Sequence, residues 1–150
     1  MKKIMLISSA GGHYGELQKI EEFNNDNNII ITEKTKYIKD RKNQYYIKYG
    51  SRKNKIKYPF IFIFNSIKSF YFLLKFKPNI IISTGAHSCV SFFYLAKLLK
   101  IKSIYIESFA KVNNPSLTYN IIKNKADVVL VQHEELLNVY ENSKFIGGVY

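Results

Sequence analysis

The chain has 150 residues, of which 47% are hydrophobic, and a single cysteine, Cys89. This length and composition predict one globular domain, residues 1–150, and exclude an intrachain disulfide framework, as is typical of a reducing compartment. The net charge of +12 is carried almost entirely by lysine, with Arg41 and Arg52 as the two arginines. Because sequence-specific nucleic-acid readers depend on arginine, we expect no nucleic-acid partner and favour a membrane surface or a phosphate-bearing ligand.

Short apolar runs alternate with longer helical stretches along the chain. The first run, residues 4–7, is too short for the apolar part of a signal peptide and favours a buried strand. Nearly all-apolar strands that alternate with helices predict an α/β fold, a Rossmann-like parallel sheet with helices on both faces. We expect strands at 3–8, 29–32, 45–48, 79–83, 102–106, 127–131 and 144–146, and helices at 14–23, 58–77, 88–99, 116–123 and 134–140.

In such sheets ligands bind at the carboxyl ends of the strands. The first such segment contains Gly11, Gly12 and His13. Glycines let the backbone approach a ligand closely, a helix N-terminus favours an anion, and a histidine there serves as a general base or a phosphate donor. We therefore expect a phosphate or diphosphate site with His13 as the catalytic candidate; the alternatives are a βα turn without a ligand and a surface histidine without a role.

Two further segments follow predicted strands. Thr84, Gly85 and Ala86 are suited to hold a second anionic or sugar group. The alternative is a helix start capped by His87 or Ser88, and both interpretations can hold together. In the other segment, Glu107 and Ser108 end a buried strand, where a carboxylate is unusual. We expect Glu107 to bind sugar hydroxyls or to shape its loop rather than to act in catalysis.

The segment 58–77 carries apolar and aromatic residues at helical spacing, with lysines around them. Polar residues at 65–69 interrupt it, which argues against a transmembrane span. We expect a partly inserted amphipathic helix whose Phe60, Phe64 and Phe72 contact the membrane. The alternative is a core helix or a subunit interface.

No Cys/His set has metal-ligand spacing, so we expect neither a metal nor a cofactor. The competing interpretation is a stand-alone dinucleotide-binding oxidoreductase. For it, Ala10, Gly12 and Gly15 approximate the glycine fingerprint, Glu33 takes the place of the ribose-binding acid, and Tyr119 with Lys123 mimics a dehydrogenase pair. The first glycine of the fingerprint is absent, and a fluorescence titration with NAD(P) separates the two interpretations.

Several segments occur in an order that resembles a known family. The chain is similar to the PssD proteins of bacterial capsule and exopolysaccharide synthesis, which are related to asparagine-linked glycosylation protein 14. The resemblance covers almost the whole chain and rests on residues 8–13, 83–86, 107–112, 115–118, 126–127, 131–136 and 147–150.

This resemblance implies the N-terminal half of a GT-B glycosyltransferase. It implies an acceptor-binding subunit on the inner face of the cytoplasmic membrane, while a PssE-type subunit carries most of the UDP-sugar site. The reaction would extend a polyprenyl-diphosphate-linked sugar, with a β-1,4 linkage, in surface polysaccharide synthesis. The family has arginine in place of Lys111, which keeps the charge without the bidentate fork, and usually tryptophan in place of His133.

For the site, the resemblance implies that the segment 11–13 approaches the acceptor diphosphate or its attacking hydroxyl, and that Thr84, Gly85 and Ala86 shape the same cleft. Glu107 and Ser108 would bind the acceptor sugar or order the loop around it. We expect the chain alone to transfer no sugar, since it supplies one of two halves. The third alternative is a scaffold that recruits the catalytic subunit and touches no substrate.

Overall fold

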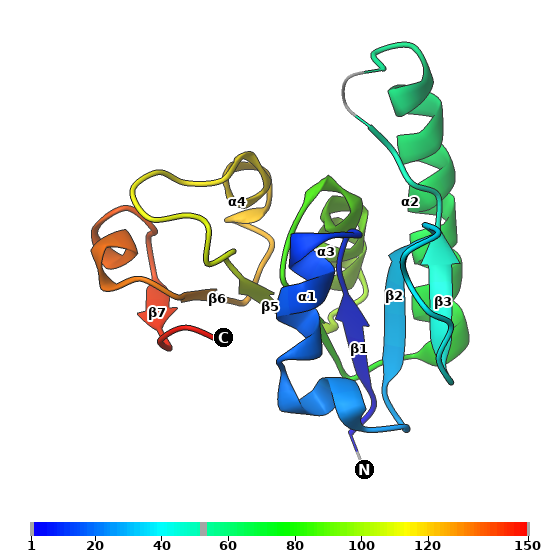
Figure 1. The fold of residues 1–150 in the computed structure, drawn as a ribbon, viewed down its shortest axis with the longest axis horizontal. Helices are drawn as coiled ribbons and strands as arrows, with labels where there is room; N and C mark the ends of the chain where they lie inside the picture. The colour runs from blue at the N-terminus through cyan, green and yellow to red at the C-terminus, as the bar shows by residue number, and fades with distance from the viewer. Residues whose placement is uncertain (1, 52–53, 150) are drawn as a thin grey trace.

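The computed structural model describes residues 2–51 and 54–149 (Figure 1). Arg52 and Tyr150, named above, lie outside the described residues. Seven parallel strands form one sheet in the order β3-β2-β1-β4-β5-β6-β7. They are β1 (Ile4–Ile7), β2 (Ile29–Glu33), β3 (Gln44–Ile47), β4 (Ile80–Ser83), β5 (Lys102–Ile106), β6 (Val128–Val131) and β7 (Ser143–Phe145).

Helices cover both faces of this sheet, because alternate residues of the strands point to opposite sides. Leu6 and Ile30 pack with α1 on one face, while Ile7 and Ile31 belong to the core under α2, α3 and α4 on the other. The helical elements are α1 (Gly12–Gln18), η1 (Glu21–Asn24), α2 (Lys57–Phe76), η2 (His87–Cys89), α3 (Val90–Leu98), α4 (Leu117–Ile122) and η3 (Glu134–Asn138). The predicted Rossmann-like α/β fold is confirmed.

The expected helix at 14–23 is instead two elements. The chain is extended at Ile20, between α1 and η1, and this break turns Phe23 back to meet the Tyr14 ring edge-to-face at 5.7 Å. The helix expected at 134–140 is the 3₁₀ segment η3, in which Leu136 is the one buried residue. A single buried side chain gives a short segment little packing with which to stabilise a longer helix.

Strand register places the segments of interest along one edge of the sheet. Ile7 is the parallel partner of Ser83, and Ser83 is the partner of Tyr105. The residues that follow β1, β4 and β5 therefore leave the sheet side by side at its carboxyl edge.

The helix α2 lies beside β3 at one end of the sheet (Figure 1), and it turns polar residues toward the sheet. The Asn65 side chain exchanges hydrogen bonds of 2.9 and 2.8 Å with the Lys48 backbone. Ser69 is fully buried, and the Lys68 ammonium donates to the Tyr46 carbonyl at 2.6 Å. The residues that interrupt the apolar pattern thus attach α2 to the sheet.

The opposite face of α2 is apolar and exposed. Phe60 is 73% exposed and Ile67 66%, and together they form part of a stripe made of Phe60, Ile63, Phe64, Ile67, Phe70, Tyr71 and Leu74. By length and mean hydropathy, 1.2, the helix is apolar enough to cross a membrane, although a buried core helix can meet the same criteria. The expectation for Phe72 is wrong: it is 5% exposed and packs against Tyr45 and Phe76.

Candidate functional site

The loops after β1 and β4 are joined by a reciprocal pair of hydrogen bonds. The His13 ring Nδ1 lies 2.8 Å from the Thr84 carbonyl, and the Thr84 hydroxyl donates to the His13 carbonyl at 2.7 Å. Because a carbonyl only accepts, Nδ1 carries the proton in this contact. In neutral His13 the Nε2 lone pair is therefore left to accept a proton.

A buried carboxylate, that of Glu16, lies next to the His13 ring. Glu16, one turn along α1, is 2% exposed, and its Oε2 lies 3.8 Å from His13 Nδ1. Burial lowers the pKa of His13, but the Glu16 carboxylate and the Thr84 carbonyl outweigh it, so the pKa lies above its ordinary value. The other Glu16 oxygen accepts from the Ser108 hydroxyl at 2.8 Å and the Phe109 N–H at 2.9 Å. Glu16 thus connects the imidazole to the loop after β5.

The backbone of both loops adopts conformations that side chains disfavour. Gly11 has φ +83° and Gly85 φ +111°. A Cβ on Gly85 would lie 3.3 Å from both the His13 Cε1 and the Tyr105 hydroxyl, so a side chain there would displace the imidazole. Ala86 has φ +69° and ψ 166°, a region populated essentially by glycine, and such residues concentrate at functional sites.

A second buried carboxylate lies at the end of β2. Glu33 is 2% exposed and accepts the Ala10 N–H at 3.2 Å. Its Oε1 lies 3.8 Å from the His87 Nε2, and burial raises the pKa of this carboxyl. The expected caps are not found: neither η2 nor α3 has a side-chain cap from His87 or Ser88.

Glu107 is held differently. It is 1% exposed, and both of its oxygens accept hydrogen bonds, from the Tyr105 hydroxyl at 3.1 Å, the Ser108 N–H at 2.9 Å and the Tyr140 hydroxyl at 2.5 Å. Its carbonyl accepts from the Gln132 amide. This geometry matches the loop-shaping role expected of Glu107, and its role as a sugar contact stays a prediction.

Buried polar atoms without a hydrogen-bond partner gather at the same edge. Among the described residues these atoms are Ser8 Oγ, Glu16 Oε2, Thr32 Oγ1, Glu33 Oε1 and Ser88 Oγ. All of them lie at or beyond the carboxyl ends of β1, β2 and β4, or on α1. Unpaired buried groups are rare in folded proteins and call for an explanation, so their concentration here makes this edge the candidate site.

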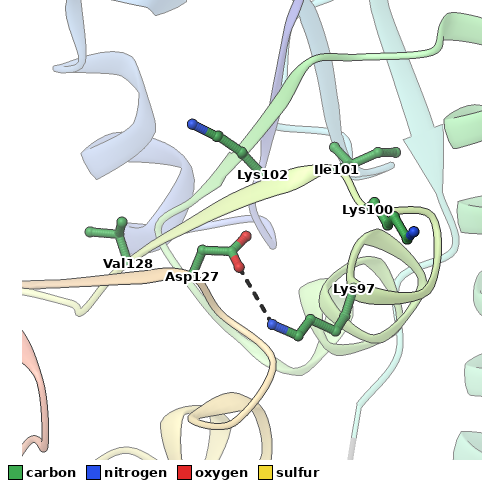
Figure 2. Close-up of a pocket in the computed structure, with 6 residues that line it drawn as sticks. All are labelled: Lys97, Lys100, Ile101, Lys102, Asp127 and Val128. Carbon is green, nitrogen blue, oxygen red and sulfur yellow. Dashed lines mark ion pairs between the residues drawn. The ribbon is translucent and has the colours of Figure 1, made fainter.

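Hollows of the surface also lie away from this edge. One of about 440 Å³ is lined by Lys97, Lys100, Lys102 and Asp127, at the amino ends of β5 and β6 (Figure 2). Figure 2 shows Lys97 and Asp127 pointing toward each other, with 3.6 Å between the charged atoms. This hollow is at the opposite edge from the unpaired groups. The residues at 2–51 and 54–149 contain no His/Cys/Asp/Glu cluster suited to a metal.

The structure also places the residues of the dinucleotide interpretation. Tyr119 is buried and its ring lies 4.1 Å from that of Tyr140, so it is a core residue rather than half of a catalytic pair. Glu33 points into the protein and binds the Ala10 N–H rather than facing a ribose site. Cys89, the single cysteine, is fully buried, and burial raises the pKa of its thiol to about 12.

Sequence reasoning found the loops but missed the carboxylate Glu16. Its spacing of three residues from His13 within a helix is a usable signal, since such residues share a helix face. Glu33 was considered for a ribose alone, and His87 for a cap alone. Their proximity follows from the pairing of β2 and β4 with opposite sides of β1, which the sequence does not reveal.

Known proteins resemble the chain in sequence. The alg14 subunit of a UDP-N-acetylglucosamine transferase from Schizosaccharomyces pombe is 38% identical over 77 residues, covering 48% of this chain and 37% of that protein. An N-acetylglucosamine transferase from Borreliella burgdorferi, named for an N-acetylmuramyl-(pentapeptide) pyrophosphoryl-undecaprenol acceptor, is 31% identical over 97% of this chain and 44% of its own length. The chain thus spans less than half the length of these relatives.

Solved structures share the fold. Acinetobacter baumannii MurG superimposes with a TM-score of 0.77 at 18% identity, covering 99% of this chain and 46% of that one. The UDP-GlcNAc 2-epimerase of Methanocaldococcus jannaschii, in complex with UDP-GlcNAc and UDP, has a TM-score of 0.71 at 16% identity, covering 97% of this chain and 46% of that one. In both cases one sheet of this kind forms less than half of the other chain.

The family described as "Oligosaccharide biosynthesis protein Alg14 like" matches residues 52–149. This match spans well over half of the chain and includes β4 to β7 with the loops that follow β4, β5 and β6. The chain therefore belongs to the Alg14-like family of oligosaccharide biosynthesis proteins.

Proposed function

We propose that the chain is the acceptor-side subunit of a two-component glycosyltransferase that uses a UDP-sugar, in the manner of the transferase subunits to which it is similar. The observation that carries the proposal is the carboxyl edge of the sheet, where His13, two strained loops and several unpaired buried groups meet. The substrate is a sugar linked to a polyprenyl diphosphate, as the name of the Borreliella burgdorferi relative suggests.

In this proposal the glycine loop holds the acceptor and His13 accepts its proton. The acceptor hydroxyl attacks the anomeric carbon of the UDP-sugar, the bond to UDP breaks, and the hydroxyl proton passes to His13 Nε2. Thr84 holds the opposite ring nitrogen, which fixes the tautomer that this step needs. Gly11, Gly12, Gly85 and Ala86 provide the close backbone approach to the diphosphate.

We propose further that the exposed stripe of α2 rests on the membrane. A soluble helix normally turns its polar face outward, whereas α2 turns Asn65 and Ser69 inward and presents Phe60 and Ile67 to the outside. Lysines on and after the helix, Lys57, Lys75 and Lys77, add attraction to anionic lipid. Peripheral attachment to the inner face of the cell membrane brings the site to a lipid-linked acceptor.

Liposome flotation with anionic vesicles tests this attachment. The variant Phe60→Glu, Ile67→Glu is expected to stay folded and to lose most flotation, since both side chains are largely exposed. The matched control Tyr37→Glu, Leu117→Glu changes two exposed apolar residues on other elements and is expected to float as the wild type does. Equal flotation of all three proteins would remove α2 as the anchor.

The partner in this proposal is a PssE-type subunit that supplies the UDP-sugar site, and the product enters capsular or exopolysaccharide synthesis through a β-1,4 linkage. The test is a radiolabelled transfer assay with UDP-N-acetylglucosamine and a polyprenyl-diphosphate-linked sugar. We expect turnover when the second subunit is co-expressed and none from this chain alone, because positioning both reactants is worth about 7–11 kcal/mol. Robust turnover by the isolated chain would contradict the two-component proposal.

A further inference from the structure

We propose that His87 and Glu33 form a second diphosphate-binding arm of the site, in which His87 contacts the anion and Glu33 positions its imidazole. The inference rests on the proposed function for the source of the diphosphate. It adds a binding side chain from the loop after β4 and a supporting carboxylate from β2.

The first observation is a repeated arrangement. His13 and His87 each lie 3.8 Å from one oxygen of a glutamate that is almost completely buried, Glu16 and Glu33 respectively. Each of these two glutamates has one oxygen without a hydrogen-bond partner. In Glu33 this is the oxygen that faces His87. One of these imidazoles, His13, lies against Gly85, and the other, His87, directly follows Ala86 in the chain.

The second observation is the charge balance around Glu33. A buried carboxylate is costly unless a cation or several donors compensate it. The Ala10 N–H donates to one Glu33 oxygen at 3.2 Å, and the His87 imidazole faces the other oxygen at 3.8 Å. A protonated His87 placed between this carboxylate and an anionic ligand would be stabilised from both sides.

The third observation is that the imidazole is already positioned. The His87 ring lies 5.3 Å from the Tyr58 ring in an edge-to-face contact, and its Nε2 would lie 3.7 Å from a Cβ on Gly50. Its side chain remains 20% exposed, so a ligand can reach it. Tyr58 lies in the first turn of α2, so His87 lies next to the N-terminal end of the helix that carries the exposed apolar stripe.

The fourth observation connects the arm to the glycine loop. Glu33 accepts the N–H of Ala10, directly before Gly11, while His87 directly follows Ala86. One buried carboxylate thus bears on both loops that are proposed to hold the acceptor. An anion bound by His87 would therefore also affect Glu33, the carboxylate that accepts a hydrogen bond from the glycine loop.

The test is binding of inorganic pyrophosphate to the 150-residue chain, followed by calorimetry and by the ring resonances of its three histidines, His13, His87 and His133. We expect His87 and His13 resonances to shift and His133 to stay constant. His87→Gln is expected to weaken binding about 10-fold, the loss of a charge-assisted hydrogen bond. Glu33→Gln keeps an oxygen for the Ala10 N–H and is expected to weaken binding about 3-fold while the His13 shift persists.

Geranyl diphosphate and UDP serve as further probes, since a lipid-linked acceptor and a sugar nucleotide both carry a diphosphate. We expect the His87 dependence with the prenyl diphosphate and not with UDP. Unchanged pyrophosphate affinity in His87→Gln, or shifts confined to His13, would overturn the inference. The experiment needs no second subunit and no sugar transfer, so a failed transfer assay with intact His87-dependent binding would count against the proposed function alone.

Discussion

Glu16, Glu33 and Glu107 are buried at the carboxyl edge of the sheet, and their carboxylate oxygens differ in how many hydrogen bonds they accept. Glu107 has both oxygens occupied by side-chain and backbone donors, including the Tyr140 hydroxyl at 2.5 Å. Glu16 and Glu33 each keep an oxygen without a partner, and each lies 3.8 Å from an imidazole. A fully paired network orders its surroundings, whereas an incompletely paired one is stabilised further by a ligand.

The edge therefore has a framework part, around Glu107, and a part around Glu16 and Glu33 that we propose binds the ligand. Glu107 joins the loop after β5 to Tyr140, close to β7, and its contacts are internal. The loops after β1 and β4 combine unusual backbone angles with open carboxylate oxygens. Substitutions in the first part should therefore change stability, and substitutions in the second part should change activity.

The largest expected effect is on turnover. His13→Ala, assayed with the second subunit, is expected to lower the rate by about 10²–10⁴-fold, the range for loss of a general base, with a modest change in thermal melt. His133→Ala is the matched control, since His133 is a half-buried imidazole outside the loops after β1 and β4 and bonds to the Phe109 carbonyl, and it should leave the rate near wild type. Full activity of His13→Ala would remove His13 from the mechanism.

The framework part is tested by Glu107→Ala. The change leaves the buried hydroxyls of Tyr105 and Tyr140 and the Ser108 N–H without their acceptor, so we expect a loss of about 2–4 kcal/mol in the free energy of unfolding. Urea denaturation measures it. The exposed Glu134→Ala should change stability by less than about 0.5 kcal/mol. If the two variants were equally stable, Glu107 would not be a framework residue.

The pairing of His13 with Glu16 predicts a pH dependence. Because the folded-state pKa of His13 is raised, its protonation stabilises the fold below the unfolded value of about 6.5. This contribution is lost as the pH rises through the folded-state pKa. NMR titration of His13 should show its pKa fall in Glu16→Gln, where burial, the largest cause acting on it, is less opposed. The exposed Glu21→Gln should leave the pKa of His13 unchanged. An unchanged pKa of His13 in Glu16→Gln would show that the Glu16 carboxylate does not raise it.

The smallest expected effect concerns backbone strain at Ala86. Its φ of +69° and ψ of 166° are adopted essentially by glycine and cost a non-glycine residue about 1–3 kcal/mol. Ala86→Gly is therefore expected to raise the free energy of unfolding by about 1 kcal/mol after the greater chain entropy of glycine is subtracted. Ala110→Gly, at a position without positive φ, should not stabilise. No gain in Ala86→Gly would mean that the loop carries no such strain.

Much of the fold was predictable because its signals are local. Apolar runs such as 128–131 and the glycine turn at 11–12 fix strands and their loops within a few residues. The rule that ligands bind at carboxyl ends then predicted a site at the loops after β1 and β4, which the structure brings together. The failures concern orientation: helical spacing alone did not show that Phe72 faces the sheet and Phe60 does not, because the side on which α2 packs is set by β3.

The partners of buried groups were also beyond the sequence. Glu107 and Tyr140 are 33 residues apart, and Glu33 ends β2 whereas His87 lies in η2, after β4. Such pairs depend on strand order, in which β1 lies between β2 and β4. A single sequence has the residues of these pairs but gives no sign of which will meet.

The central claim is that the loops after β1 and β4 hold a lipid-linked acceptor on this chain. Amide hydrogen exchange measures it directly, with a short polyprenyl-diphosphate-linked sugar and, separately, UDP-N-acetylglucosamine. The account predicts that the acceptor slows exchange at residues 10–16 and 84–88, while the UDP-sugar alone leaves both segments unchanged. Protection by the UDP-sugar and not the acceptor, or protection at neither loop as expected of a pure scaffold, would contradict it.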